Sequence, residues 1–312
     1  MEFDEQTNTG RLLHGASHEC PGHYAERLGE WILWEAAEPD PQVEDRIVGL
    51  ARENGSKGVY RKLLSRHIRG RDVASVSPEL IFGEAAPDRF TVRENGICYE
   101  LSFCEGYSYG LFLDQRENRR RFIANEIQGG FSVFDGKGSP ALLNTFAYTC
   151  GFSVCAAKAG AVTTSLDLSR KYLDWGRRNF QLNGVNDQEH DFIYGDAFDW
   201  CRRLAKKDRL FDAIVLDPPT FSKGKGRSIF RAEQDYGRLV AVVLPLLKPA
   251  GVLLSSTNAA RLEPYAFVDS VRQAIRAAGR SVQSELFVGQ PADFPASARE
   301  PAYLKTVWMR VS

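Results

Sequence analysis

The stretch LNTFAYTCGFSV, residues 143–154, decides the fold that we expect for this chain of 312 residues. It begins as a buried strand and ends as a helix, and a link rich in polar and aromatic residues joins the two. A plain turn between a strand and a helix needs only a residue or two that suit a turn. We therefore expect this turn to hold a ligand.

Apolar strand patterns alternate with amphipathic helix patterns on both sides of this turn. The expected strands are 141–146, 161–168, 191–196, 211–217 and 251–257, with a late strand at 303–311. The expected helices are 153–160, 169–184, 197–208, 235–247 and 263–279. Strict alternation is typical of an α/β domain whose sheet is doubly wound and mostly parallel.

Residues 1–104 have a different pattern, which predicts a small α+β domain with a role in substrate recognition. Strands are expected at 30–37 and 58–68, a helix at 41–54, and a hairpin at 88–103 that turns at Asn95-Gly96. Residues 105–312 then form the second domain. The net charge of the chain is 0, but residues 1–104 carry −6, so the second domain is the one expected to meet an anionic partner.

The six cysteines include no CxxC pair and no spacing typical of zinc, so we expect free thiols and no metal. The acidic N-terminus lacks the apolar segment of a signal peptide. No stretch reaches the ~18 apolar residues of a membrane span. These features predict a cytoplasmic protein that binds no membrane.

Polar residues follow four successive strands of the expected sheet, where ligands of such sheets bind. They are Asn144, Asp167, Asp196 and Asp217. Any one Asp after a strand is explained by helix capping, but three of them beside the polar turn indicate a site. The GxGxxG fingerprint and the P-loop lysine are absent. The site therefore suits a cofactor that has a ribose and an adenine but no pyrophosphate. Asp167 would accept hydrogen bonds from the ribose hydroxyls, and Asp196 would accept one from the adenine amine. S-adenosylmethionine fits this description.

Several motifs resemble class I methyltransferases, and most closely the bacterial large-subunit ribosomal RNA methyltransferases that modify cytosine C5 or guanine N7. They are LNTFAYTCGFSV, SLDLSRKYLDWGRRNFQLNG, DPPTFS and YLK, with YGLFLDQRENRR (Tyr109–Arg120) upstream. The resemblance runs from about Arg11 to the C-terminus and implies a Rossmann-like domain. It also implies S-adenosylmethionine bound by Gln115, Asn144, Phe146, Ala147, Tyr148, Thr149, Gly151, Asp167, Leu168, Asp196 and Asp217.

Two features depart from this group. The group has Gly where this chain has Cys150, which we expect to be a small buried residue. Some relatives also carry an N-terminal RNA-binding module, which we do not expect here.

The DPPTFS motif opens the substrate side, with Asp217, Pro218 and Phe221 as the expected catalytic residues. The resemblance places Asp217 near the methionine part of the cofactor. The prolines stiffen the turn, and Phe221 either stacks on a flat base or belongs to the core. No cysteine lies at the fourth or fifth strand end to attack a cytosine ring, which favours methylation of a nitrogen such as guanine N7.

Substrate contacts are expected from Asn258 and Arg261 after the fifth strand and from Lys223, Lys225 and Arg227 in a Gly-rich loop. A helix cap and solvated charges explain the same residues. Two further basic clusters, 61–71 and 116–121, are weaker candidates. We expect RNA as partner, but a methyltransferase for a small molecule or protein stays open, as does a non-catalytic adenosyl-binding protein. The oligomeric state is open too, with a homodimer as one option.

Overall fold

A computed structural model describes residues 3–64, 76–106, 108–136, 138–223 and 229–312. The chain forms two compact units: Met1–Arg116 with Pro291–Ala302, and Glu117–Gln290 with Tyr303–Ser312. A boundary between functional domains at residues 104/105 stays a prediction.

The first unit is built on a five-stranded mixed sheet in the order β1-β2-β3-β4-β5. Its strands are β1 (Thr9–His14), β2 (His23–Leu28), β3 (Trp31–Ala36), β4 (Gly58–Leu63) and β5 (Glu79–Gly83). Helix α1 (Pro41–Glu53) begins at Asp40, whose carboxylate caps it, and packs on one face of the sheet. The hairpin of β6 (Phe90–Glu94) and β7 (Ile97–Leu101) turns at Asn95 and Gly96, both at positive φ, as expected.

A segment from near the C-terminus, Pro291–Ala302, completes the first unit. Asp293 accepts the backbone N–H of Arg11 (3.0 Å) and pairs with the Arg116 guanidinium. Glu300 accepts the backbone N–H of Ala16 (2.8 Å) and the hydroxyl of Tyr24 (3.1 Å). The first unit therefore needs a segment that lies more than 170 residues away in the sequence, which the sequence patterns did not predict.

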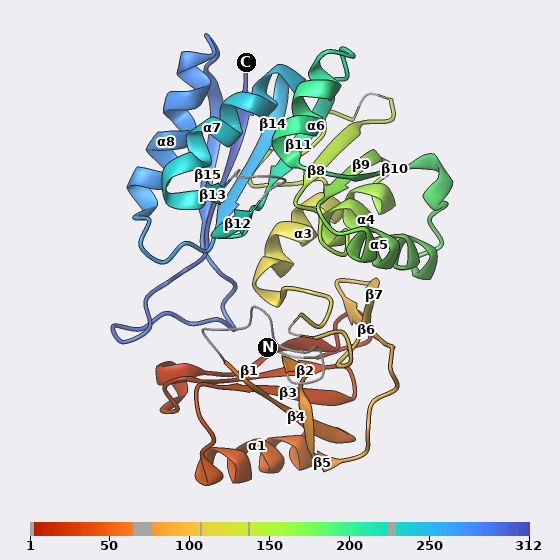
Figure 1. Ribbon diagram of the computed structural model, residues 1–312, viewed down its shortest axis with the longest axis vertical. Coiled ribbons are helices and arrows are strands. Elements are labelled where there is room, and N and C mark those ends of the chain that lie inside the picture. Colours follow the sequence, from red (N-terminus) through yellow and green to blue (C-terminus); the bar gives the residue numbers. More distant parts are fainter. Residues whose placement is uncertain (1–2, 65–75, 107, 137, 224–228) are drawn as a thin grey trace. The chain divides into compact units, whose positions relative to one another are not determined.

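The second unit contains the seven-stranded sheet β10-β9-β8-β11-β14-β16-β15 (Figure 1). Its strands are β8 (Ala141–Thr145), β9 (Val162–Asp167), β10 (Asp191–Tyr194), β11 (Phe211–Leu216), β14 (Leu247–Thr257), β15 (Val282–Val288) and β16 (Lys305–Val311). The first five in spatial order are parallel, and β16 runs antiparallel to both of its neighbours, β14 and β15. The expected doubly wound, mostly parallel sheet is confirmed.

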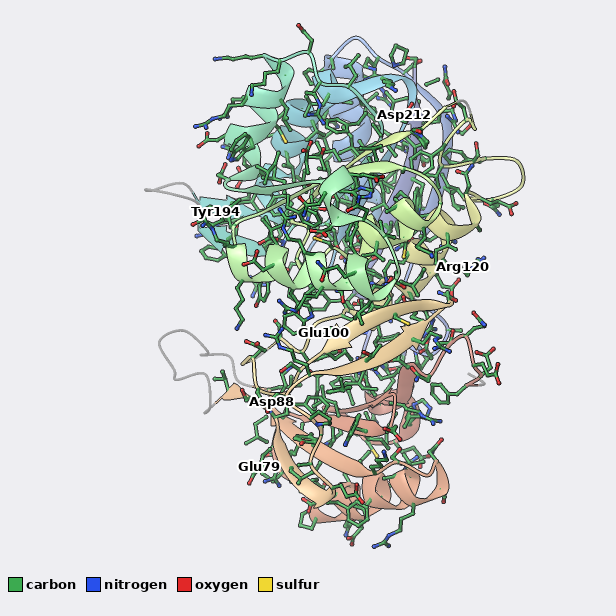
Figure 2. All side chains as sticks on the ribbon, turned by 90° about the vertical axis from the view of Figure 1, so that its right-hand side faces the viewer. Glu79, Asp88, Glu100, Arg120, Tyr194 and Asp212 are labelled. Carbon is green, nitrogen blue, oxygen red and sulfur yellow. The ribbon has the colours of Figure 1, made fainter. Side chains whose placement is uncertain are left out.

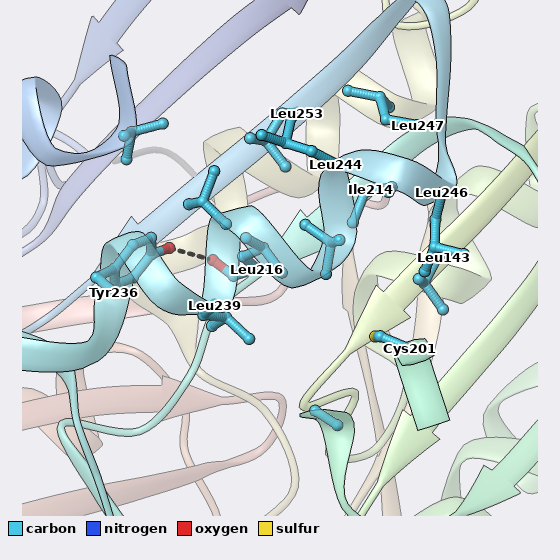
Figure 3. Close-up of a cluster of buried hydrophobic side chains, with 14 of the residues drawn as sticks. Leu143, Cys201, Ile214, Leu216, Tyr236, Leu239, Leu244, Leu246, Leu247 and Leu253 are labelled. Carbon is cyan, nitrogen blue, oxygen red and sulfur yellow. Dashed lines mark hydrogen bonds between the residues drawn. The ribbon is translucent and has the colours of Figure 1, made fainter. Parts of the chain in front are cut away.

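Helices cover both faces of this sheet. One face carries α3 (Arg116–Ala124), α4 (Gly151–Lys158) and α5 (Arg170–Leu182), where Phe122 of α3 packs against Phe152 and Trp308. The other face carries α6 (Ala197–Ala205), α7 (Ala232–Val243) and α8 (Pro264–Ala277). The core under these helices joins apolar residues of β8, β9, β11, β14 and β16 to α6, α7 and α8 (Figure 3).

The two ends of the sheet differ in character. At the amino end, Asp212 accepts the backbone N–H of Ala141 (2.7 Å) and pairs with Lys248 (2.9 Å), which ties β8, β11 and β14 together. At the carboxyl end lie the polar turns and exposed aromatic residues. Figure 2 labels one residue near each end: Asp212 at the amino end of the sheet, and Tyr194, the last residue of β10, at the carboxyl end. In the parts of the chain that the structure describes, no helix has the length and apolar character to cross a membrane.

Candidate active site

The turn after β8 has an unusual backbone. Phe146, Tyr148 and Cys150 have φ angles of 56°, 49° and 63°, so three of five successive residues are left-handed without being glycine. Each such residue costs roughly 1 kcal/mol or more. Strain of this kind persists where the surroundings over-determine it, and it concentrates at ligand sites.

Asp167, at the end of β9, supplies much of the restraint. One carboxylate oxygen accepts the backbone N–H of Tyr148 (2.9 Å) and the other accepts that of Ser169 (2.8 Å). Burial raises the pKa of Asp167, and these N–H donors oppose the rise. Because a carboxylate has about four acceptor positions, Asp167 can hold the turn and still accept from a ligand.

The Cys150 side chain is accommodated by a glycine on the next helix. A Cβ added to Gly176 of α5 would lie 2.3 Å from the Cys150 sulfur. Asn179, one turn further along α5, donates to the Thr149 carbonyl (2.9 Å). The thiol of Cys150 is fully buried, and burial raises its pKa to about 12. Cys150 is therefore a packed, protonated residue at a position whose φ suits glycine.

Asn144 and Asp196 have structural partners. Asn144 is buried and donates to Ser153 in α4 (2.9 Å), and Ser153 also accepts from Ser165 (2.8 Å). Asp196 caps α6 by accepting the backbone N–H of Asp199 (3.1 Å). Their parts in cofactor binding stay predictions, as do those of Phe146, Ala147, Thr149, Gly151 and Leu168.

The DPPTFS segment follows β11 directly, and a buried tyrosine fixes its start. The Tyr236 hydroxyl of α7 lies 2.8 Å from the Leu216 carbonyl and 2.9 Å from the Ser256 carbonyl (the first contact is drawn in Figure 3). Leu216 precedes Asp217, and Ser256 precedes Thr257 at the end of β14. Tyr236 thus ties the ends of both strands together, one residue before the polar turns begin.

Phe221 and Arg231 lie together on a small hairpin of β12 (Phe221–Lys223) and β13 (Ile229–Arg231). The Phe221 ring is 37% exposed, with the Arg231 guanidinium 5.7 Å from its centre. Phe230 points the other way and packs near Phe146 and Phe198. Phe221 is therefore presented at the surface and is not a core aromatic.

A hydrogen bond joins the turns that follow β11 and β14. The Thr220 hydroxyl donates to Oδ1 of Asn258 (2.7 Å), and both residues are exposed, as is Arg261. We call Thr220, Phe221, Arg231 and Asn258 the target side. We call the turn 144–151 with Asp167 and Asp196 the cofactor side.

The structure describes only part of the three basic clusters, and several of the described residues form ion pairs within the protein. Lys225 and Arg227 lie outside the described residues, as do Arg66, Arg69 and Arg71 of the cluster 61–71. Of the remaining members, Lys62 pairs with Glu35, Arg61 pairs with Glu44 and Glu79, and the buried Arg116 pairs with Asp293. The clusters 61–71 and 116–121 thus contain residues engaged within the protein. Gln115 lies buried in the first unit, in a 3-10 helix at Leu113–Gln115.

Three residues that shape the site were not predicted from the sequence: Tyr236, Thr220 and Gly176. Tyr236 reads as an ordinary core residue of an amphipathic helix, and Gly176 as an ordinary helix residue. Thr220 stands inside a motif that we had quoted, but nothing in the sequence connects it to Asn258.

Comparison with known proteins agrees with this geometry. Residues 52–310 match the family described as S-adenosylmethionine-dependent methyltransferase. The ribosomal RNA large subunit methyltransferase of Deinococcus radiodurans is 31% identical over 310 residues, 98% of this chain and 73% of that protein. Ribosomal RNA large subunit methyltransferase I of Aeromonas hydrophila is 34% identical over 306 residues, 96% of this chain and 74% of that protein.

A solved structure is similar over the same extent. SMU.776, a methyltransferase solved in complex with S-adenosylhomocysteine, has a TM-score of 0.83 and 26% identity, and the match covers 98% of this chain and 76% of that one. Fold, cofactor and reaction class thus agree with those expected from the sequence. The chain belongs to the S-adenosylmethionine-dependent methyltransferases and is an enzyme of that class.

Proposed function

We propose that this enzyme methylates a base of large-subunit ribosomal RNA, with guanine N7 favoured over cytosine C5. The relatives described above bear the names of large-subunit rRNA methyltransferases. The observation that carries the proposal is the target side: an exposed Phe221 with the Arg231 guanidinium beside it, directly after Asp217-Pro218-Pro219. A partly exposed aromatic ring with an adjacent cation suits a nucleic acid base and its phosphate.

The cofactor side fits S-adenosylmethionine. Asp167 holds the strained turn, and the acceptors of Asp167 and Asp196 match ribose hydroxyls and an adenine amine. When bound, the cofactor supplies an electrophilic methyl group on a sulfonium. On this proposal Asp217 contacts the methionine part, and Phe221 orients the target base.

The thiols support transfer to nitrogen. Methylation at cytosine C5 uses a thiolate that adds to the ring. In the second unit Cys150, Cys155 and Cys201 are fully buried, and burial raises the pKa values of Cys150 and Cys201 to about 12. A guanine N7 already carries a lone pair, so positioning alone can supply most of the catalysis.

The test is a map of modified nucleosides in large-subunit rRNA. We expect a strain without the gene to lose one 7-methylguanosine, and the wild-type gene to restore it where Asp217→Ala does not. An unchanged rRNA map in the deletion strain would contradict the proposal.

A small-molecule or protein substrate is the second candidate, because the net charge of 0 gives no overall attraction to a polyanion. Salt separates the two. Activity on RNA should fall steeply between about 50 and 200 mM salt, whereas activity on a small molecule need not. The cytoplasmic location belongs to this proposal as well.

A further inference from the structure

The hydrogen bond between Thr220 and Asn258 joins two loops and also sets the orientation of the Asn258 side-chain amide. In an asparagine side chain one atom accepts hydrogen bonds and the other donates two. The Thr220 hydroxyl donates to Oδ1 of Asn258 at 2.7 Å, so the oxygen is the atom turned toward Thr220. The amide nitrogen, with its two N–H groups, is then turned away from Thr220.

The surroundings keep this arrangement in place. Strands β11 and β14 are neighbours, with Leu216 opposite Ser255, and the Tyr236 hydroxyl ties their ends together. The Thr257 hydroxyl accepts the backbone N–H of Ala259 (3.2 Å), which holds the chain on both sides of Asn258. The amide is thus oriented before any substrate arrives, the condition under which a polar group discriminates well.

Nucleic acid bases differ in what they offer such a donor. Guanine presents the acceptors N7 and O6 on one edge, whereas adenine presents an amino group beside N7, and cytosine presents its amino group on the edge that carries C5. When the ring atom to be methylated faces the cofactor, an amide N–H can pair with guanine O6 beside N7, but it would face the amino group of adenine or cytosine, which is a second donor. Uracil offers an acceptor on that edge, but its C5 requires an attacking nucleophile, like that of cytosine.

We infer that Asn258 is a specificity-determining residue that donates to the O6 carbonyl of a target guanine, and that Thr220 is the residue that positions its amide. The inference rests on the proposed function and deepens it, because it assigns the recognised edge of the base to one side chain. Phe221 holds the face of the base and Asn258 reads its edge.

The test uses four variants on protein-free large-subunit rRNA from a strain lacking the gene, with radiolabelled S-adenosylmethionine. Asn258→Asp replaces the donor with an acceptor of the same shape. Thr220→Val removes the hydroxyl at constant volume, and Thr220→Ser restores it. Asn186→Asp makes the same chemical change at an exposed cap, where Oδ1 accepts the Gln188 backbone N–H (3.2 Å).

We expect Asn258→Asp to lower kcat/KM for rRNA by about 100-fold, because the substitution replaces the hydrogen bond to the O6 carbonyl with two facing acceptors. The calorimetric Kd for S-adenosylmethionine should stay the same. Thr220→Val should lower kcat/KM for rRNA about tenfold. The kcat/KM of Thr220→Ser should lie within about twofold of the wild-type value, and that of Asn186→Asp should equal it. Liquid chromatography and mass spectrometry of the Asn258→Asp product should show a higher ratio of methyladenosine to methylguanosine, because a carboxylate accepts from the 6-amino group.

Three results would overturn the inference. Asn258→Asp could methylate rRNA at the wild-type rate, it could lose rRNA activity and cofactor affinity together, or the wild-type product could be methylcytidine or methyladenosine. If the wild-type enzyme transfers no methyl group to rRNA, the proposed function itself fails. That outcome is visible before any variant is compared.

Discussion

Replacing Tyr236 by Phe should disturb catalysis from within the core, without touching either substrate. The hydroxyl lies 2.8 Å from the Leu216 carbonyl and 2.9 Å from the Ser256 carbonyl, at the ends of β11 and β14. The ring is fully buried and meets Phe267 edge-on, with 4.9 Å between ring centres. The substitution keeps this packing and removes only the oxygen.

The cost follows from the geometry. The loss of a hydrogen bond costs about 1 kcal/mol net, and a buried acceptor left short of a partner costs about 1–3 kcal/mol. Two carbonyls share this one donor, so we expect the free energy of unfolding to fall by about 2 kcal/mol. For a unit of this size the melting temperature should fall by roughly 4–8 °C.

The catalytic effect should be selective. The segments that follow the two tied residues lead to Thr220 and Phe221 after β11 and to Asn258 after β14. The target side should therefore loosen more than the cofactor side, the turn 144–151 with Asp167 and Asp196, which is built on β8, β9 and β10. We expect kcat/KM for rRNA to fall about tenfold, since small misplacements are costly in catalysis, with little change in the Kd for S-adenosylmethionine. Burial raises the pKa of Tyr236 well above its usual value, with a further contribution from Asp217, so the hydroxyl keeps its proton and the effect should not vary between pH 6 and pH 8, to within about twofold.

Tyr265→Phe is the matched control, because Tyr265 is 76% exposed on α8. It should leave stability and activity unchanged. The reasoning is refuted if Tyr236→Phe has the melting temperature of the wild type, or if its affinity for S-adenosylmethionine falls as far as its activity on rRNA.

Three other predictions concern the cofactor, the thiols and the loop. Asp167→Ala should weaken S-adenosylmethionine binding tenfold or more, about 1.4 kcal/mol by calorimetry, and unchanged affinity would remove Asp167 from the site. Cys150→Ser should keep turnover, and no covalent adduct should form on 5-fluorocytosine-containing rRNA; a trapped adduct would restore the cytosine reading. Neutralising Lys223, Lys225 and Arg227 together should raise KM for RNA and reduce the salt slope by up to about three, and normal methylation at every salt concentration would exclude the loop from RNA binding.

The alternation of strand and helix patterns was enough to predict the catalytic fold. The residues after β8, β9, β10 and β11 could be assigned to one edge, because parallel strands all end on the same side. Asp167 shows how far such an assignment reaches. Its place at the strand end was predictable, whereas its two bonds to the backbone of the turn depend on a left-handed Tyr148 that no local preference favours.

Other features depend on contacts between residues far apart in the sequence. The buried pair of Arg116 and Asp293 joins residues 177 positions apart, and neither carries a local signal of its partner. Strand β15 (Val282–Val288) was missed, because its alternating pattern is short and interrupted by charge. Tyr236 was missed for another reason. Its position in an amphipathic helix accounts for the buried ring, but the contacts of its hydroxyl with the Leu216 and Ser256 carbonyls are visible only in the structure.

The most direct test of the whole account is the identity of the nucleoside that the purified enzyme methylates. Protein-free large-subunit rRNA from the deletion strain is incubated with S-adenosylmethionine carrying a labelled methyl group, then digested and separated by mass. The account predicts label in 7-methylguanosine. Label in 5-methylcytidine would contradict the transfer to nitrogen, and an unlabelled digest would contradict the rRNA substrate.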